Sequence, residues 1–280
     1  MVSVVPVHIP HSYFRIPPSP SIIRRMDTLV ILSPHFDDAV LSCGGQIWET
    51  RRQGGIVHVL TLFAGPPLGE PPPFAQVQHA MWGSPPDPNR LRRAEDVAAL
   101  TRLGCYNFHH LDAPDAVYRL GTAGQVLYDT EEAIFGEVHP DEATYAVTLA
   151  DMVRAYLPMQ ATILAPLGAG HHVDHLLSHA VGLSLLNEGR EVAFYEELPY
   201  IESPGALEAA LAEKLNWQME ATPISEEALQ AKLAAMAYYQ TQIPVLYRTE
   251  EEMQRRVRAI AQGAVGGEGY AERVWRRSNE

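Results

Sequence analysis

Residues 28–45 read TLVILSPHFDDAVLSCGG, and they set the architecture expected for this 280-residue chain. Thr28–Ser33 is a short apolar run of the kind that a parallel sheet buries. The pattern predicts a helix from about Asp38 to Gln53, which two glycines end, and a second strand at Ile56–Ala64. A strand, a helix and a strand joined by short links predict a right-handed parallel crossover.

The same alternation continues along the chain. Further strands are expected at 106–111, 161–167 and 191–196. Further helices are expected at 89–103, 144–156, 172–187, 204–214, 225–239 and 250–262, with a tail after them. This order predicts an α/β protein with one doubly wound, Rossmann-like three-layer domain around a mostly parallel central sheet. We expect this single domain at 27–280, preceded by an extended N-terminal arm at 1–26.

Two long irregular stretches interrupt the alternation, each after a strand. Residues 65–89 are dense in proline, and residues 112–143 are acidic and poorly periodic. Loops of this length in a compact domain are usually functional or mobile. We therefore expect them to form the walls of a ligand cleft.

The composition excludes several classes of protein. The chain is 46% hydrophobic with a net charge of −13, so nucleic acid and anionic membranes are not expected partners. No apolar stretch approaches the roughly 18 residues that span a bilayer. The two cysteines are too few for a disulfide framework. The N-terminus lacks the pattern of a signal peptide, so a cytoplasmic location is expected.

Two polar clusters follow predicted strands, at the sheet edge where open parallel sheets bind ligands. Ser-Pro-His-Phe-Asp-Asp occupies 33–38, and His-His-Val-Asp-His occupies 171–175. Taken alone, the first cluster could be a helix cap and the second a surface feature. Together they supply what a catalytic zinc needs, which is two histidines and a carboxylate, with a second carboxylate to take a proton from bound water.

At this point the sequence resembles the PIG-L (LmbE-like) N-acetylglucosaminyl deacetylase family. SPHFDDAVLSCGG resembles its first signature, usually His-Pro-Asp-Asp-Glu, and HVDH resembles its second, His-x-Asp-His. Arg92-Arg93-Ala94-Glu95, FYEELPYI and GYAERVWRR extend the resemblance over Leu29 to Arg277. Phe36 and Ala39 depart from the usual proline and glutamate, and neither position supplies a ligand or the base.

The resemblance implies a Zn²⁺ ion, or another divalent metal, held by His35, Asp38 and His175. It implies that Asp37 is the general base, and that the reaction removes an acetyl group from an N-acetylated sugar or glycoconjugate. The expected partner is thus a small molecule, and the oligomeric state stays open, a homo-oligomer included.

Further roles are also implied by the resemblance. His172 would polarise the acetyl carbonyl, and Asp174 would pair with His172 and hold it in the charged state. The residues expected near the sugar are Arg92, Glu95, Asp115 and Arg119.

Three alternatives stay open. A nucleotide-binding or transferase domain would need a Gly-x-Gly-x-x-Gly turn, which is absent after the first strand. A non-catalytic metal-binding or sugar-binding module has the same residues without turnover. A third hypothesis keeps the hydrolase but assigns it an N-acyl substrate that is not a sugar.

Overall fold

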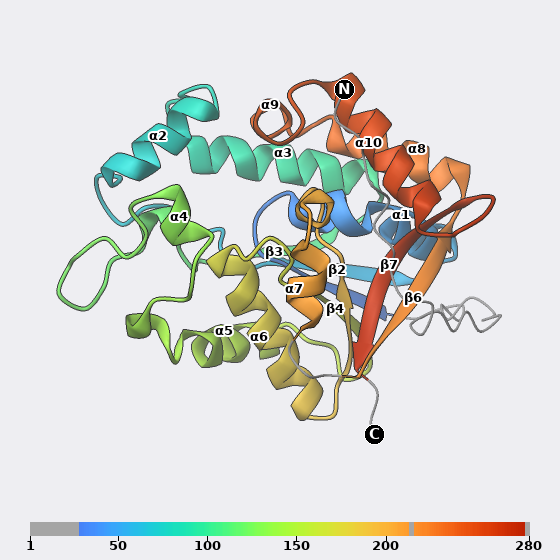
Figure 1. Ribbon diagram of the computed structural model, residues 1–280, viewed down its shortest axis with the longest axis horizontal. Helices are drawn as coiled ribbons and strands as arrows, with labels where there is room; N and C mark the ends of the chain where they lie inside the picture. The colour runs from blue at the N-terminus through green and yellow to red at the C-terminus, as the bar shows by residue number, and fades with distance from the viewer. Residues whose placement is uncertain (1–27, 213–215, 278–280) are drawn as a thin grey trace.

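A mixed sheet of seven strands, in the order β3-β2-β1-β4-β5-β7-β6, forms the centre of the computed structural model, which describes residues 28–212 and 216–277 (Figure 1). Strands β1 to β5 run parallel to one another, whereas β7 is antiparallel to both β5 and β6. The strands are β1 (Thr28–Ser33), β2 (Ile56–Thr61), β3 (Asn107–His110), β4 (Thr162–Pro166), β5 (Glu191–Tyr195), β6 (Trp217–Ile224) and β7 (Tyr270–Arg277).

Helices cover both faces of the sheet, as Figure 1 shows. The α-helices are α1 (Asp38–Arg52), α2 (Pro73–Met81), α3 (Pro88–Arg102), α4 (Glu131–Ile134), α5 (Tyr145–Arg154), α6 (Val173–Asn187), α7 (Ala206–Leu211), α8 (Glu226–Met236), α9 (Ile243–Leu246) and α10 (Glu250–Gly263). Short 3₁₀ helices are η2 (Ala116–Tyr118), η3 (Pro140–Glu142) and η4 (Tyr200–Glu202).

Strand β1 explains the three layers, because successive side chains of a strand point to opposite faces. Leu29 and Ile31 belong to a core cluster shared with α1, α3, α8 and α10. Val30 and Leu32 belong to a second cluster shared with α5 and α6. The expected α/β fold with a mostly parallel central sheet is confirmed.

Two strands were not expected from the sequence. The stretch 270–277, expected as a tail, is β7, and it pairs with β6 over eight residue positions. Both strands carry charged side chains that pair across the sheet, such as Arg276 with Glu220, so neither is the apolar run that marks a buried parallel strand. The stretch 65–89, expected to be irregular, contains α2.

The topology decides where a ligand binds. From β1 the chain goes to β2 on one side, whereas β4 lies on the other side of β1. Such a switch point opens a crevice at the carboxyl ends of β1 and β4, where ligands of doubly wound sheets bind. The long segments after β2 and β3 are the stretches expected to form a cleft.

The arm expected at 1–26 lies outside the described residues. Within the described ranges, no helix combines the length and the apolar character that crossing a membrane requires.

Candidate metal centre

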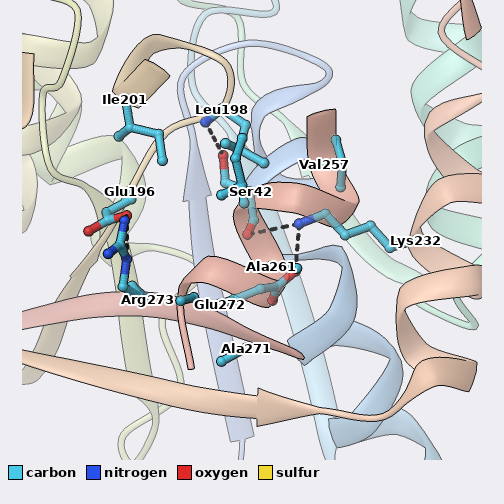
Figure 2. Close-up of a pocket in the computed structure, with 12 residues that line it drawn as sticks. Ser42, Glu196, Leu198, Ile201, Lys232, Val257, Ala261, Ala271, Glu272 and Arg273 are labelled. Carbon is cyan, nitrogen blue, oxygen red and sulfur yellow. Dashed lines mark hydrogen bonds and ion pairs between the residues drawn. The ribbon is translucent and has the colours of Figure 1, made fainter. Parts of the chain in front are cut away.

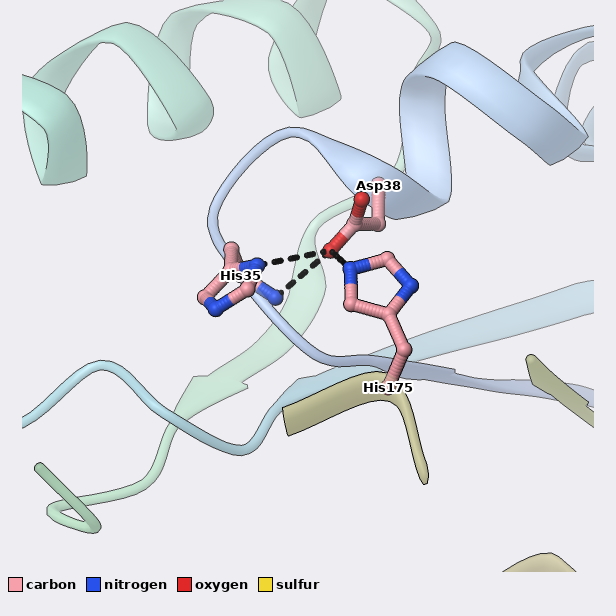
Figure 3. Close-up of side chains that lie close together, drawn as sticks. All are labelled: His35, Asp38 and His175. Atoms are coloured by element: carbon pink, nitrogen blue, oxygen red, sulfur yellow. Dashed lines mark hydrogen bonds and ion pairs between the residues drawn. The ribbon is translucent and has the colours of Figure 1, made fainter. Parts of the chain in front are cut away.

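His35, Asp38 and His175 come together at the switch point, as Figure 3 shows. Asp38 Oδ2 lies 3.3 Å from His35 Nδ1 and 3.4 Å from His175 Nε2. All three residues are buried, although the first cluster follows β1 and His175 is on α6. His35 and His175 are 140 positions apart in the sequence, and the fold brings all three residues within reach of one cation.

The turn after β1 is held by its own short polar contacts. Ser33 Oγ donates to the carbonyl of His35 at 2.6 Å and accepts from the backbone N–H of Ala39 at 3.0 Å. The backbone N–H of His35 donates to Asp38 Oδ2 at 2.8 Å. Asp37 is the N-cap residue of α1, yet its side chain makes no capping hydrogen bond. The structure therefore does not support a capping role for Asp37, and its carboxylate is available for chemistry.

The donor set fits a divalent metal. His175 Nε2 is buried and has no hydrogen-bond partner, although it faces Asp38. Two imidazole nitrogens and one carboxylate oxygen are a ligand set that catalytic zinc uses, with a position left for water. An unpaired buried nitrogen is costly in a protein interior, and a coordinated cation would satisfy it.

The electrostatics of the centre favour positive charge. Burial lowers the pKa of His175, but Asp38 and Glu197 outweigh it and raise the pKa to about 9. Burial likewise lowers the pKa of His35, but Asp174 and Asp38 leave it well above its usual value. Without a metal ion, the carboxylates thus favour the protonated forms of both imidazoles. A bound metal ion would supply the positive charge instead.

Asp37 lies beside the three expected ligands. Burial and the neighbouring Asp38 raise the pKa of Asp37 to about 6, against the opposing effect of Arg92. The Arg92 guanidinium is 3.7 Å from Asp37 Oδ1 and 3.9 Å from Asp115 Oδ2. It is stacked on the Trp82 ring at 4.6 Å. Arg92, Asp115 and Asp37 therefore form one side of the centre.

The carboxylate of Asp174 makes different contacts from those expected. Its Oδ2 atom is 3.0 Å from His35 Nε2 and accepts from the backbone N–H of Ala116, and its Oδ1 atom pairs with Arg119. The expected pairing with the His172 ring is not made; only the backbone N–H of Asp174 contacts that ring, at Nδ1. Asp174 therefore contacts the ring of His35, an expected metal ligand, and not that of His172.

The surroundings of His172 bear on the charged state expected for its ring. Burial and the proximity of His35 hold the pKa of His172 well below its usual value, which favours the neutral ring. Its Nδ1 accepts the backbone N–H of Asp174 at 3.2 Å, in the N-cap position of α6. In a neutral ring whose Nδ1 accepts, Nε2 carries the proton. This tautomer follows from the hydrogen-bond geometry.

Two residues expected near the sugar are taken up by other partners. Arg119 is buried between Asp174 and Glu142, and Glu142 also accepts from Tyr128 Oη at 2.6 Å. The Glu95 carboxylate accepts from the backbone N–H and the hydroxyl of Thr241 at 2.9 and 2.6 Å. Both side chains thus contact protein groups that hold the surrounding segments together.

Several residues around the centre were not assigned a role from the sequence. The Phe135 ring is 5.3 Å from that of His172, and the Tyr200 ring is 5.1 Å from that of His175. Glu197 contacts His175 Nδ1 at 3.3 Å. Phe135 lies in a long loop without a spacing that marks it, and FYEELPYI resembles a family segment without indicating which ring each residue contacts, so the fold reveals these neighbours.

Comparisons with known proteins identify the family of this chain. The family model described as PIG-L, GlcNAc-PI de-N-acetylase, matches residues 30–186. The 2′-N-acetylparomamine deacetylase of Niallia circulans is 30% identical over 245 residues, which cover 80% of this chain and 83% of that protein. The chain therefore belongs to the PIG-L family, and the expected enzyme class, a deacetylase hydrolase, is confirmed.

Solved structures show the same fold. The zinc-inhibited form of the teicoplanin deacetylase Orf2 has a TM-score of 0.79 and 27% identity, covering 90% of this chain and 99% of that one. The A40926 pseudoaglycone deacetylase Dbv21 has a TM-score of 0.71 and 28% identity, covering 92% of this chain and 100% of that one. The family model confirms the resemblance inferred from the two signatures over residues 30–186, and the similarity to these two solved structures covers 90% and 92% of the chain.

Proposed function

We propose that this protein removes the acetyl group from an N-acetylated sugar or glycoconjugate and releases acetate and a free amine, with a divalent metal, Zn²⁺ in the first instance. The observation that carries the proposal is the convergence of His35, Asp38 and His175 beside an Asp37 carboxylate that caps nothing. Relatives that act on N-acetylparomamine and on teicoplanin support a glycoside as the substrate. We also propose that 27–280 act as one deacetylase domain.

The three buried residues would hold the metal through His35 Nδ1, an Asp38 oxygen and His175 Nε2, the atoms that face one another. When bound, such a cation lowers the pKa of its water to near 7 and polarises a carbonyl oxygen. Asp174 on His35 and Glu197 on His175 accept from the remaining ring nitrogens and so orient both rings.

Asp37 is the proposed base. Its carboxylate lies in the same turn as two ligands, and its raised pKa places it closer to the working pH than an ordinary aspartate. It takes the proton of the attacking water and passes it to the departing amine nitrogen, so that the amine leaves neutral. A base of this kind contributes about 10²- to 10⁴-fold in rate.

His172 is the proposed donor to the acetyl oxygen. Because Nδ1 accepts the backbone N–H of Asp174, the proton on Nε2 is free to donate as negative charge develops on that oxygen. One such donor is typically worth about 3 kcal/mol in the transition state. The neutral ring acts as a hydrogen-bond donor and needs no charge from Asp174.

Arg92 and Asp115 are the proposed sugar contacts, because they line the centre and the Arg92 guanidinium makes only long contacts with the carboxylates of Asp37 and Asp115. We propose that the segments 65–89 and 112–143 form the walls of the substrate cleft, since they follow β2 and β3 at the same sheet edge. Exchanging these segments with those of a relative would change substrate preference and leave metal uptake intact. An unchanged preference would refute their role.

The test is acetate release across a panel of N-acetylated sugars and glycosides, with the protein loaded separately with Zn²⁺, Co²⁺ or Mn²⁺. Several metals are compared because one structure of the teicoplanin deacetylase Orf2 is of a zinc-inhibited form. Asp37→Asn should bind one metal ion per chain and lose about 10²- to 10⁴-fold in kcat. Full acetate release by metal-free protein, or by the Asn variant, would contradict the proposal.

A further inference from the structure

Glu197 lies at the end of β5 and is fully buried, yet no feature of the two signatures points to it. Its carboxylate receives four donors, two on each oxygen. Oε1 accepts from the backbone N–H of Gly168 at 2.7 Å and lies 3.3 Å from His175 Nδ1. Oε2 accepts from the backbone N–H groups of Leu167 and Ala169 at 3.1 and 3.3 Å.

The turn that Glu197 binds leads directly into the second signature. Gly168 and Gly170 have φ values of +86° and +84°, a left-handed conformation that glycine adopts without strain. A Cβ atom at Gly170 would lie 2.7 Å from the Tyr200 ring, so this turn is also closely packed. The backbone N–H groups of the turn point to one carboxylate, which therefore fixes the path of the chain from β4 to α6.

The same carboxylate determines how His175 presents its other nitrogen. A neutral ring, the form that binds a metal, has an unprotonated Nε2 when it donates Nδ1–H to Glu197, and Nε2 is the atom that faces Asp38 at 3.4 Å. Histidines that bind metals commonly donate their other N–H to a carboxylate, which fixes both tautomer and orientation.

We propose that Glu197 is a positioning residue of the metal centre, whose carboxylate fixes the His175 ring and the turn before α6 together. This inference rests on the proposed function, because it takes His175 as a metal ligand. It predicts a loss of metal affinity when Glu197 is changed, beyond any loss of stability.

The neighbouring Glu196 provides a matched control. It is also buried at the end of the same strand, but it binds Arg273 and the indole N–H of Trp275, on the side of β5 away from His175. Figure 2 shows Glu196 beside Arg273, in a small hollow that Lys232 and Glu272 also line. Glu196→Gln therefore removes a buried charge of the same strand without touching the proposed metal centre.

The Glu197→Gln change keeps the size of the side chain and replaces one acceptor oxygen by an NH₂ group. Because two donors face each oxygen, the amide NH₂ must face two N–H groups whichever way it turns. Either the turn or the His175 ring loses its acceptor. We expect the Kd for Zn²⁺ to rise about 10- to 100-fold, the range found when such partners of metal ligands are removed.

The experiment measures Zn²⁺ affinity by competition with a chelator for the wild-type protein, Glu197→Gln and Glu196→Gln, with the thermal midpoint of each metal-free protein as a measure of stability. The proposal expects weaker Zn²⁺ binding for Glu197→Gln alone. A Kd within twofold of wild type in Glu197→Gln, or an equal loss in Glu196→Gln, would overturn it. A wild-type protein that binds no metal would instead overturn the proposed function.

A measurement on the wild-type protein keeps the proposal testable if Glu197→Gln does not fold. Nitrogen NMR of the histidine rings in the zinc-loaded protein, assigned through bonds, reports which nitrogen carries a proton. We expect His175 to be protonated at Nδ1 and to bind the metal through Nε2. Metal binding through Nδ1 of His175 would overturn the proposal.

Discussion

Arg119 offers a test of how the charges behind the metal centre are balanced. Its guanidinium is buried between the carboxylates of Asp174 and Glu142 and packs on the Phe63 ring at 5.1 Å. Changing Arg119 to Met keeps most of the apolar packing and removes the positive charge. Two buried carboxylates then lose their cation at once.

The expected loss in the free energy of unfolding follows from the burial of the Arg119 guanidinium. Removing one partner of a buried ion pair costs about 3–5 kcal/mol, because the remaining charge is left uncompensated. Arg154 is the matched control, since it also pairs with two carboxylates, Asp151 and Glu188, but its side chain is 36% exposed. Arg154→Met should cost at most about 1 kcal/mol, as surface pairs do.

The difference in stability between wild type and Arg119→Met should decrease as the pH falls. Burial raises the pKa of Asp174, but Arg119 and His35 outweigh it and hold the pKa well below its usual range. A depressed pKa in the folded state adds stability above the unfolded-state pKa of about 3.9, and that stability is lost as the pH falls below it. The difference between wild type and Arg119→Met should therefore be largest near pH 7 and shrink below about pH 4.

The assay is urea unfolding at pH 7 and at about pH 3, with the free energy of unfolding and its slope fitted for each protein. A loss of about 3–5 kcal/mol at pH 7 for Arg119→Met supports the account. A loss below about 1 kcal/mol, or one equal to that of Arg154→Met, would refute the reasoning that burial makes this ion pair important.

Three further predictions use other parts of the structure. Burial and Asp38 raise the pKa of Asp37 to about 6, and a bound cation lowers this pKa again. The value of kcat/KM should therefore fall as the pH decreases at or below about pH 6. A value of kcat/KM that is unchanged down to pH 4 would exclude Asp37 as the base. Gly45→Ala should lower the free energy of unfolding by about 1–3 kcal/mol, because the new Cβ would lie 2.7 Å from Ile224 Cδ1. Gly267→Ala, at a position with open space around it, should change the free energy of unfolding little. Equal changes in the two variants, measured by urea unfolding, would contradict this prediction. Removing the metal with a chelator should abolish acetate release and lower the thermal midpoint, and metal at 100 times its Kd should restore about 2.7 kcal/mol of stability; a midpoint that ignores the metal would argue against a folded-state site.

The sequence predicted the buried parallel strands of the sheet. Strands such as Thr28–Ser33 lie between two helical layers and are therefore continuous apolar runs that stand out. Strands β6 and β7 were not predicted because they are antiparallel and are not continuous apolar runs; β6 reads WQMEATPI and β7 reads YAERVWRR. They pair with each other over eight positions, with cross-strand contacts such as Arg276 with Glu220, which the sequence of a single strand does not reveal.

The candidate site shows the same division. The positions of His35, Asp38 and His175 follow from local clusters at strand ends, and such ends meet at one sheet edge. The partners of Asp174 did not follow, because its choice of His35 and Arg119 over His172 depends on segments distant in the chain. The neutral state of His172 likewise results from burial, which the sequence does not report.

We propose that one cation is held between His35 Nδ1, an Asp38 oxygen and His175 Nε2. Anomalous diffraction at the zinc absorption edge, from crystals of zinc-loaded protein, tests it most directly. We predict one strong peak within coordination distance, about 2.0–2.2 Å, of all three atoms. Zinc bound elsewhere on the chain, with these three side chains uncoordinated, would contradict the account.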